Sequence, residues 1–300
     1  MIWVNQIIQG ILLGGYYAVL ACGLSLMFGV MRIINLAHGD LAVLAAFLVW
    51  LLTQQWGLPI VPALVAVILA MGVFGALLQR TVLERSLRSG ILVPLLSTFG
   101  LSIVIENLLF SGFGADTRSL APAIGDLAFD SWSIGGQIYV GRLSVLIFLA
   151  ALLLLAGLQL LLLRTSLGRS LRATAESPDI AELVGINSRA VYMAAAAIAV
   201  MTASLGGALL AMRATVAPYA GPSQLIFAFE AVVIGGMNSL WGTLIGGIVL
   251  GVAQNIGAQI NPQGFLIAGH IAFLLGLAIR LGLSSSETRG RLRALFGRSA

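Results

Sequence analysis

The chain has 300 residues, of which 59% are apolar and only 9% are charged, and its mean hydropathy is +1.04. Soluble globular chains are about 45–50% apolar and about 25% charged, so much of this apolar surface must face lipid. The net charge is +5, and all 16 basic residues are Arg. Without Lys the chain is excluded from the phosphate-loop ATPases and the Schiff-base enzymes. The single cysteine, Cys22, excludes an internal disulfide and a cysteine-rich zinc site.

Apolar stretches predict the membrane-spanning segments, because about 20 apolar residues cover the hydrocarbon core of a bilayer. We expect an all-α, polytopic bundle of about eight spans, with residues 1–300 forming a single transmembrane domain. Gly57-Leu58-Pro59 and residues 261–264 divide two runs that are too long for one helix. The expected spans are 6–30, 36–56, 60–79, 91–112, 143–163, 190–212, an interrupted segment at 226–258, and 264–282.

Four polar or small residues, Asn35, His38, Gly39 and Asp40, lie between the first two apolar runs. Ionisable groups at membrane depth are costly, so each is a candidate for a translocation path. One His and one carboxylate two residues apart do not face each other on a helix, which argues against a metal site. A structural role is favoured, in which these side chains bond to the backbone at a helix break.

Two further carboxylates, Glu106 and Glu230, fall inside predicted spans and toward the same side as Arg213. Either could pair with Arg213 or meet the ammonium group of a substrate, and an ion pair that satisfies buried charge is the favoured interpretation. His270 stands alone in its span and is expected to be a packing histidine.

Gly235, Gly236 and Asn238 interrupt the apolar run at 226–258. Such breaks are typical of translocation paths, because irregular backbone is tolerated only beside protein or water. The alternative is tight helix packing through small residues at Gly-x-x-x-Gly spacing. Small residues of this kind follow in the same run: Gly242, Gly246, Gly247 and Gly251. Both interpretations stay open.

The distribution of Arg predicts the orientation, because short cytoplasmic loops carry the basic excess. The clusters at 80–88, 164–189 and 280–298, together with Arg32, place thirteen Arg inside and leave three outside. The same count places the N-terminus outside, and the first ten residues lack the basic region of a signal peptide. Residues 213–225 and the tail then lie on opposite sides, which favours two half-spans or a re-entrant hairpin at 226–258.

The connecting loops carry further predictions. Residues 113–142 form the outer loop, with a small hairpin around Gly135-Gly136 that either receives a docking protein or packs as a lid. In the inner loop at 164–189, Ser166 and Ser177 are expected to cap two short helices that fit a cytoplasmic partner or lie on the lipid. The basic tail at 284–300 is expected to bind anionic lipid in the cytoplasmic leaflet, and nucleic-acid binding is not expected.

Three stretches, taken in order, resemble the membrane-spanning permease subunits of branched-chain amino-acid ABC importers, in particular the shorter H-type subunit. They are Asn35-Leu-Ala-His38-Gly39-Asp40 with the preceding Gly23 to Ile34, Ser166-Leu-Gly168-Arg169 through Asn187, and Ala231 to Gly247. The family often has Glu at the position of Asp40, a conservative departure.

The resemblance implies a set of partners: a second, related permease, two cytoplasmic ATPases, a periplasmic solute-binding protein and membrane lipid. It implies that the chain is not an enzyme, that ATP and Mg²⁺ belong to the ATPases, and that this chain carries no cofactor or metal. It also implies a multi-pass protein of the bacterial inner membrane. The implied ATPase-coupling residues are Gly168, Arg169, Arg172, Ala175, Glu176, Pro178 and Gly185.

Two alternatives remain at this point. Importers of urea, amides or aromatic acids belong to the same family, so the resemblance does not settle the substrate. A stand-alone secondary transporter would use Asp40, Glu106 and Glu230 as ion or proton sites. An intramembrane enzyme is not supported, because two isolated histidines and one cysteine form no acid–base pair.

Overall fold

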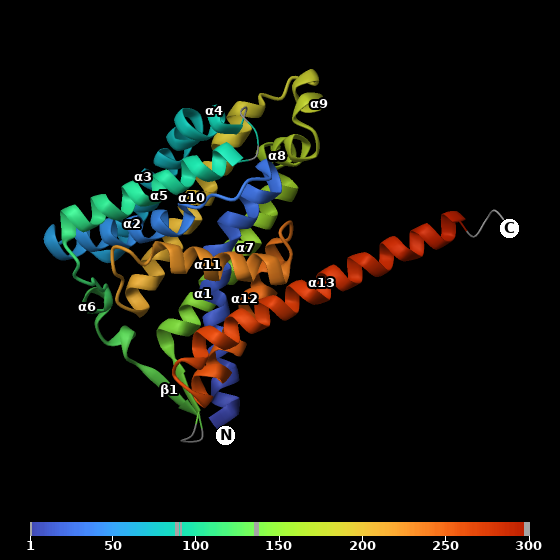
Figure 1. The fold of residues 1–300 in the computed structure, drawn as a ribbon. Coiled ribbons are helices and arrows are strands. Elements are labelled where there is room, and N and C mark those ends of the chain that lie inside the picture. The colour runs from blue at the N-terminus through green and yellow to red at the C-terminus, as the bar shows by residue number, and fades with distance from the viewer. Residues whose placement is uncertain (1, 88–89, 91, 135–137, 297–300) are drawn as a thin grey trace.

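The computed structural model describes residues 2–87, 90, 92–134 and 138–296. The chain folds into helices and one small hairpin (Figure 1). The helices are α1 (Ile2–Met31), α2 (His38–Trp50), α3 (Ile60–Leu78), α4 (Glu84–Leu87), α5 (Leu92–Phe113), α6 (Ala121–Ile124), α7 (Arg142–Arg164), α8 (Ser166–Glu176), α9 (Pro178–Leu183), α10 (Ser188–Arg213), α11 (Gly221–Gly235), α12 (Leu240–Ile260) and α13 (Gly264–Phe296). Two π-helical turns, Leu51–Gln55 and Gln79–Leu83, and one 3-10 turn, Gly125–Ala128, complete the helical elements, and the strands are β1 (Ser131–Ile134) and β2 (Ile138–Gly141).

The architecture confirms an all-α polytopic membrane protein. Among the described residues, six helices are long and apolar enough to cross a bilayer, and two further apolar helices, Gly221–Gly235 and Gly264–Arg280, are shorter. The six are Ile2–Met31, Ile60–Ser86, Leu92–Phe113, Arg142–Arg164, Ser188–Arg213 and Leu240–Ile260. The expected span at 36–56 forms one continuous helix from His38 to Gln55, α2 and its π-helical turn, but it is not among the six.

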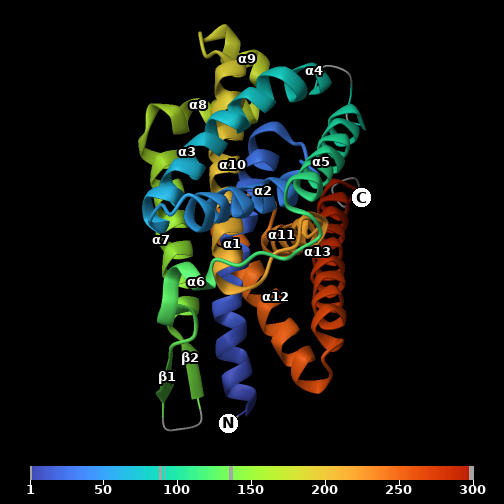
Figure 2. The ribbon, with the colours of Figure 1, turned by 90° about the vertical axis from the view of Figure 1, so that its left-hand side faces the viewer.

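The molecule has two distinct ends (Figure 2). The N-terminus and the β1–β2 hairpin lie at one end, and α4, α8 and α9 lie at the other. The hairpin confirms the strand prediction, with Trp132 opposite Val140 and Ser133 opposite Tyr139. Its predicted turn at 135–137 lies outside the described residues, as do Arg88 and the last four residues of the basic tail.

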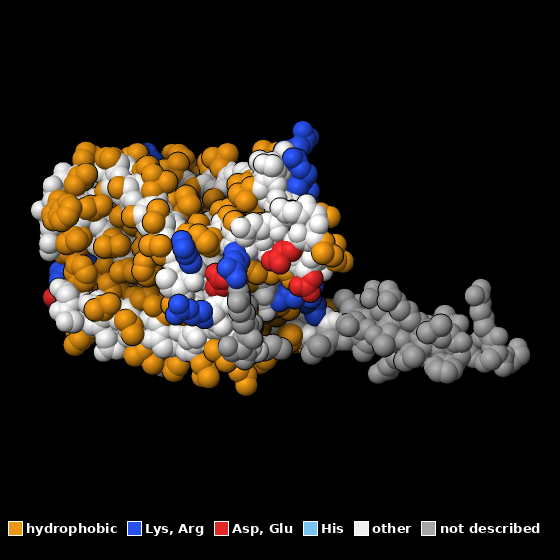
Figure 3. All heavy atoms as spheres, turned by 90° about the horizontal axis from the view of Figure 1, so that it is seen from above, with side chains coloured by type: hydrophobic (Ala, Val, Ile, Leu, Met, Phe, Trp, Pro, Cys, Tyr) orange, Lys and Arg blue, Asp and Glu red, His pale blue; other side chains and the backbone are white. Residues whose placement is uncertain are grey.

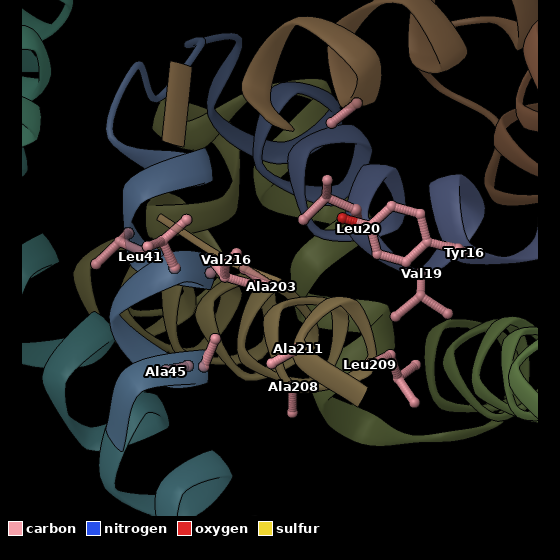
Figure 4. Close-up of a cluster of buried hydrophobic side chains, with 14 of the residues drawn as sticks. Tyr16, Val19, Leu20, Leu41, Ala45, Ala203, Ala208, Leu209, Ala211 and Val216 are labelled. Atoms are coloured by element: carbon pink, nitrogen blue, oxygen red, sulfur yellow. The ribbon is translucent and has the colours of Figure 1, made fainter. Parts of the chain in front are cut away.

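The core forms where α1, α2 and α10 meet (Figure 4). Leu20 of α1 and Leu41 of α2 are fully buried there, and Ala203 and Ala208 of α10 keep the helices close. On its other side, α1 packs antiparallel against α12 through glycines at positions 10, 14, 247 and 251, where an added Cβ would overlap the facing backbone. This contact confirms the predicted packing through small residues.

Two short helices, α2 and α11, lie across the middle of the molecule (Figure 2). The His38 ring at the start of α2 bonds through Nε2 to the carbonyl oxygen of Leu20, which lies midway along α1. At the start of α11, Gly221 faces Gly39, and an added Cβ on either residue would overlap the other helix. The two helix N-termini therefore meet in the interior of the protein.

The interrupted segment differs in part from the prediction. Its break lies at 236–239, as expected, and Gly236 adopts a φ of 109° that suits glycine. However, α11 begins at Gly221 rather than at 226, and α12 has 21 residues, enough to cross. Only the first part of the segment is a short helix.

The two halves of the chain repeat one arrangement in opposite directions. α1 and α10 pack antiparallel, with Gly23 against Ala199 and Thr202. Each is followed by an irregular stretch, a short central helix and two longer helices, α3 and α5 in the first half and α12 and α13 in the second. α3 packs on α10 as α12 packs on α1. Inverted repeats of this kind are common in transporters and place the path at their interface.

We expect Gly39→Ala to destabilise the protein, because its methyl group would overlap the carbonyl oxygen of Gly221. Overpacking costs about 1–3 kcal/mol, and the midpoint of thermal unfolding in detergent measures it. Gly100→Ala in α5 is the matched control, because a Cβ there meets no heavy atom within 4 Å. Equal midpoints for the two variants would contradict the close approach of α2 and α11.

Candidate functional site

The meeting point of α2 and α11 is built around Asp40, the third residue of α2. Asp40 is fully buried, and its Oδ2 accepts a hydrogen bond from the Ser102 hydroxyl of α5 at 2.5 Å. Its Oδ1 faces Gly221 and has no hydrogen-bond partner among the described residues. Helix N-termini carry partial positive charge, so the carboxyl group offsets the two positive ends that converge here.

The predicted polar residues before Asp40 hold the chain reversal between α1 and α2. The side-chain oxygen of Asn35 accepts a hydrogen bond from the backbone N–H of Ala37 at 3.0 Å. The backbone N–H of Leu36 donates to the Thr98 hydroxyl of α5 at 3.1 Å. His38 donates through Nε2 to the Leu20 carbonyl at 2.9 Å, and its buried Nδ1 has no partner among the described residues.

Glu230 pairs with a residue other than the predicted one. Its Oε1 lies 2.5 Å from Nδ1 of His270 on α13, so the expected pairing with Arg213 is wrong. Glu230 is buried and His270 is about half exposed. The pair resembles that of Asp40 and Ser102, because a buried carboxyl group on each short helix bonds to the last helix of its own half. His270 is thus a polar partner and not only a packing residue.

Glu106, on α5, is half-buried, and no ion pair of Glu106 with Arg213 forms within the described part of the chain. Arg213 is exposed and lines a small cavity of about 100 Å³ with Tyr16 and Asn255, toward the hairpin end. The described residues contain no group of three His, Cys, Asp or Glu side chains that could hold a metal ion.

The break after Gly235 lies against two long helices and beside a cavity, and irregular backbone at membrane depth is tolerated in such places. Ser25 of α1 donates a hydrogen bond to the carbonyl oxygen of Met237 at 3.1 Å, and Arg280 of α13 donates to that of Val233 at 2.9 Å. Asn238 is exposed and lines a cavity at the α8–α9 end. The break is therefore clamped between the first and last long helices.

The predicted coupling segment folds as the two short helices α8 and α9. Thr165, and not Ser166, caps α8, since its hydroxyl accepts a hydrogen bond from Gly168 N at 3.0 Å. Ser177 caps α9 as expected, Pro178 is its first residue, and Gly185 follows its end with a φ of 86°. The local signals in the sequence thus placed both helices, with one cap shifted by one residue.

The residues of this segment divide into buried anchors and exposed groups. Gly168 is buried, and an added Cβ there would overlap the carbonyl oxygens of Leu161 and Leu162. Ala175 is half-buried. Five of the predicted coupling residues are exposed: Arg169, Arg172, Glu176, Pro178 and Gly185.

The tip of α9 exposes large apolar side chains. Ile180, Leu183 and Val184 are 64%, 87% and 72% exposed, whereas Ala181 is buried. An open cavity of about 830 Å³ lies beside the tip and includes Tyr192. Figure 3, looking onto this end, shows basic and acidic side chains gathered near apolar ones. Large apolar groups exposed on a polar face mark a protein contact.

A helical bundle with two short central helices and a projecting helical hairpin defines a membrane transport protein. Residues 6–281 match the family described as branched-chain amino acid transport system / permease component. The chain belongs to this family, as the resemblance of its three motifs predicted.

The chain is similar over most of its length to characterised permeases. It is 32% identical to the high-affinity branched-chain amino acid transport system permease protein BraD of Pseudomonas aeruginosa, covering 86% of this chain and 87% of that one. It is 28% identical to LivH of Salmonella typhimurium, over 84% and 85% of the two chains. It is 25% identical to LivM of Escherichia coli, over 86% and 65%.

The family membership confirms several predictions. The chain is a permease subunit of an ABC transporter and a multi-pass membrane protein, not an enzyme. Permeases of this family carry no cofactor of their own and work with other ABC-transporter components.

We expect His270→Phe to destabilise the protein, because Glu230 would stay buried without its partner. Breaking a buried pair costs about 3–5 kcal/mol, and the half exposure of His270 places this case at the lower end. The double variant Glu230→Leu, His270→Phe should lose less stability than the single variant. Thermal unfolding midpoints of the three proteins measure this, and a double variant less stable than His270→Phe would contradict the pairing.

Proposed function

We propose that this permease carries branched-chain or other apolar amino acids and forms half of a translocation path with a second permease. The main support is the family match together with the central meeting of α2 and α11, around which the walls are almost wholly apolar. An apolar amino acid would meet few fixed charges there. The relatives named for branched-chain amino acids favour this substrate class over urea, amides and aromatic acids.

The junction of α2 and α11 is the proposed gate. It is closed, since Gly39 and Gly221 touch and Asp40 is fully buried. Passage requires the two short helices to separate. Half-helix N-termini bind the carboxylate of a substrate in other transporters, and the free Oδ1 of Asp40 suits its ammonium group. Access would alternate as one half of the repeat moves against the other.

The α8–α9 end is proposed to face the cytoplasm of a bacterium, in its inner membrane. The thirteen Arg assigned to the inside include Arg85, Arg169 and Arg189, which belong to elements at this end (Figure 1). Arg142, assigned to the outside, starts α7 beside the hairpin and pairs with Asp130 at 2.6 Å. This arrangement agrees with the rule that basic residues remain inside.

The exposed tip of α9 is proposed to fit one of two cytoplasmic ATPases, which hold ATP and Mg²⁺. Ile180, Leu183 and Val184 provide an apolar anchor, and Arg169, one of the predicted coupling residues, is exposed on the preceding helix α8. At the opposite end, the loop at 113–142 is proposed to receive a periplasmic solute-binding protein. In this arrangement ATPase closure moves α8 and α9, and the movement opens the gate.

Co-expression with the neighbouring transporter subunits tests the function. We expect this chain to purify with ATPases and a second permease, and the complex in liposomes to take up leucine only with ATP and the solute-binding protein. Valine and isoleucine should compete for uptake, whereas urea and benzoate should not. A chain that purifies alone, with uptake indifferent to ATP, would overturn the proposal.

We expect Leu183→Asp to lower ATP-driven uptake by about tenfold or more, because a central apolar anchor is worth at least 2 kcal/mol at a typical protein interface. Leu183 is the most exposed of the three tip residues, so the change should not disturb folding. Glu182→Gln, at the adjacent exposed position, is the control and should transport normally. Uptake rates that do not differ between the two variants would argue against docking at this tip.

A further inference from the structure

A second cavity at the α8–α9 end, the one that Asn238 lines, shares no lining residue with the cavity beside the tip of α9. It has a volume of about 500 Å³ and lies between the last turns of α1, the end of α7, α8 and the start of α12. Gly29 of α1 opens onto it, since a Cβ added there meets no heavy atom within 4 Å. Volumes of about 300–1,000 Å³ are typical of ligand sites.

Three charged side chains line this cavity: Arg32, Arg172 and Glu176. All three are exposed, and among the described residues none forms an ion pair within 4 Å. Two guanidinium groups and one carboxylate thus share one opening without partners. Such a set complements a ligand that carries both a phosphate and an ammonium group.

The backbone at Arg32 supports a ligand role for its side chain. Its φ is 55°, in the left-handed region, and its N–H donates to the carbonyl oxygen of Phe28 at 2.9 Å, which ends α1. Glycine is the residue favoured at this capping position. Among the described residues, no other non-glycine residue has a positive φ. The chain accepts this strain at a residue that lines the cavity.

Much of the remaining wall of the cavity is apolar or aromatic, as expected where a protein surface passes from lipid headgroups to hydrocarbon. Leu26 and Leu171 are buried at the back, while Leu163 and Trp241 are 53% and 41% exposed at the rim. Leu163 continues the exposed apolar surface of α7, which includes Leu160. Trp at this level is typical of the interface between headgroups and hydrocarbon. The cavity therefore opens both to the polar boundary and to the apolar side of α7.

We propose that this cavity binds one phospholipid whose headgroup carries a phosphate and a primary ammonium, that is, a phosphatidylethanolamine. Arg32 and Arg172 hold the phosphate, Glu176 holds the ammonium, and an acyl chain lies along Leu163. Basic pockets between transmembrane helices bind lipid headgroups in other membrane proteins. Because Arg172 and Glu176 belong to α8, the lipid would fasten α8 to α1.

Native mass spectrometry of the complete complex tests the site. The delipidated complex is mixed with equal amounts of dioleoyl phosphatidylethanolamine and dioleoyl phosphatidylglycerol, and the retained lipid is counted. We expect phosphatidylethanolamine to be retained in preference. Arg32→Gly should lower this retention by about tenfold, because a hydrogen bond to a charged group is lost, yet should not lower the unfolding midpoint, because glycine relieves the strain.

Two glycine variants form a matched test and control: one places a side chain in the cavity, and the other places the same side chain elsewhere. Gly29→Leu should abolish retention, while Gly157→Leu in α7, where a Cβ also meets no heavy atom within 4 Å, should leave it unchanged. Glu176→Gln should remove the preference over phosphatidylglycerol. Retention that is unchanged in Arg32→Gly and Gly29→Leu, or equal retention of both lipids by the unaltered complex, would overturn the proposal.

The lipid count does not depend on transport. A complex that retains the lipid but takes up no leucine would contradict the import function alone. A complex that imports leucine while Gly29→Leu keeps its lipid would contradict the lipid site alone.

Discussion

The close approach of two backbones, at Gly39 and Gly221, is the constraint on which the arrangement depends. Gly39 and Gly221 themselves place no side chain between the two helices, so both short helices begin inside the protein rather than at a membrane surface. Their free N–H groups and partial positive charge are then confined to a region without bulk water. The buried carboxyl group of Asp40 compensates this positive charge, and the surrounding core is mostly apolar, so few other polar groups could do so.

The inverted repeat gives each half of the chain its own support for a short helix. In the first half Ser102 of α5 holds Asp40, and in the second His270 of α13 holds Glu230. Across the two halves, Tyr16 of α1 donates a hydrogen bond to the side-chain oxygen of Gln224 of α11 at 2.7 Å. The carboxyl groups of both short helices would thus keep their partners if the glycine contact opened, whereas the bond between Tyr16 and Gln224 would have to break.

Composition and local signals were sufficient for much of the fold. Hydropathy predicted most spans because bilayer thickness fixes helix length, and Ser177, Pro178 and Gly185 predicted α9 because caps act over a few residues. Hydropathy did not show that α2 is short, since its length depends on where the chain reverses inside the protein. The partner of Glu230 lies 40 residues away, and no local pattern points to it. The repeat leaves only a faint trace, Met31-Arg32 before Gly39 and Met212-Arg213 before Gly221.

One small residue, Gly168, has a wider mechanical effect. At Gly168 the backbone of α8 packs directly against the carbonyl oxygens of Leu161 and Leu162. The corner between α7 and α8 is therefore rigid, because no flexible side chain lies between the two helices there. α7 in turn rests on α1, where Phe148 lies against Gly15. A displacement of α8 and α9 would therefore be transmitted through α7 to α1, rather than be absorbed by the surrounding lipid.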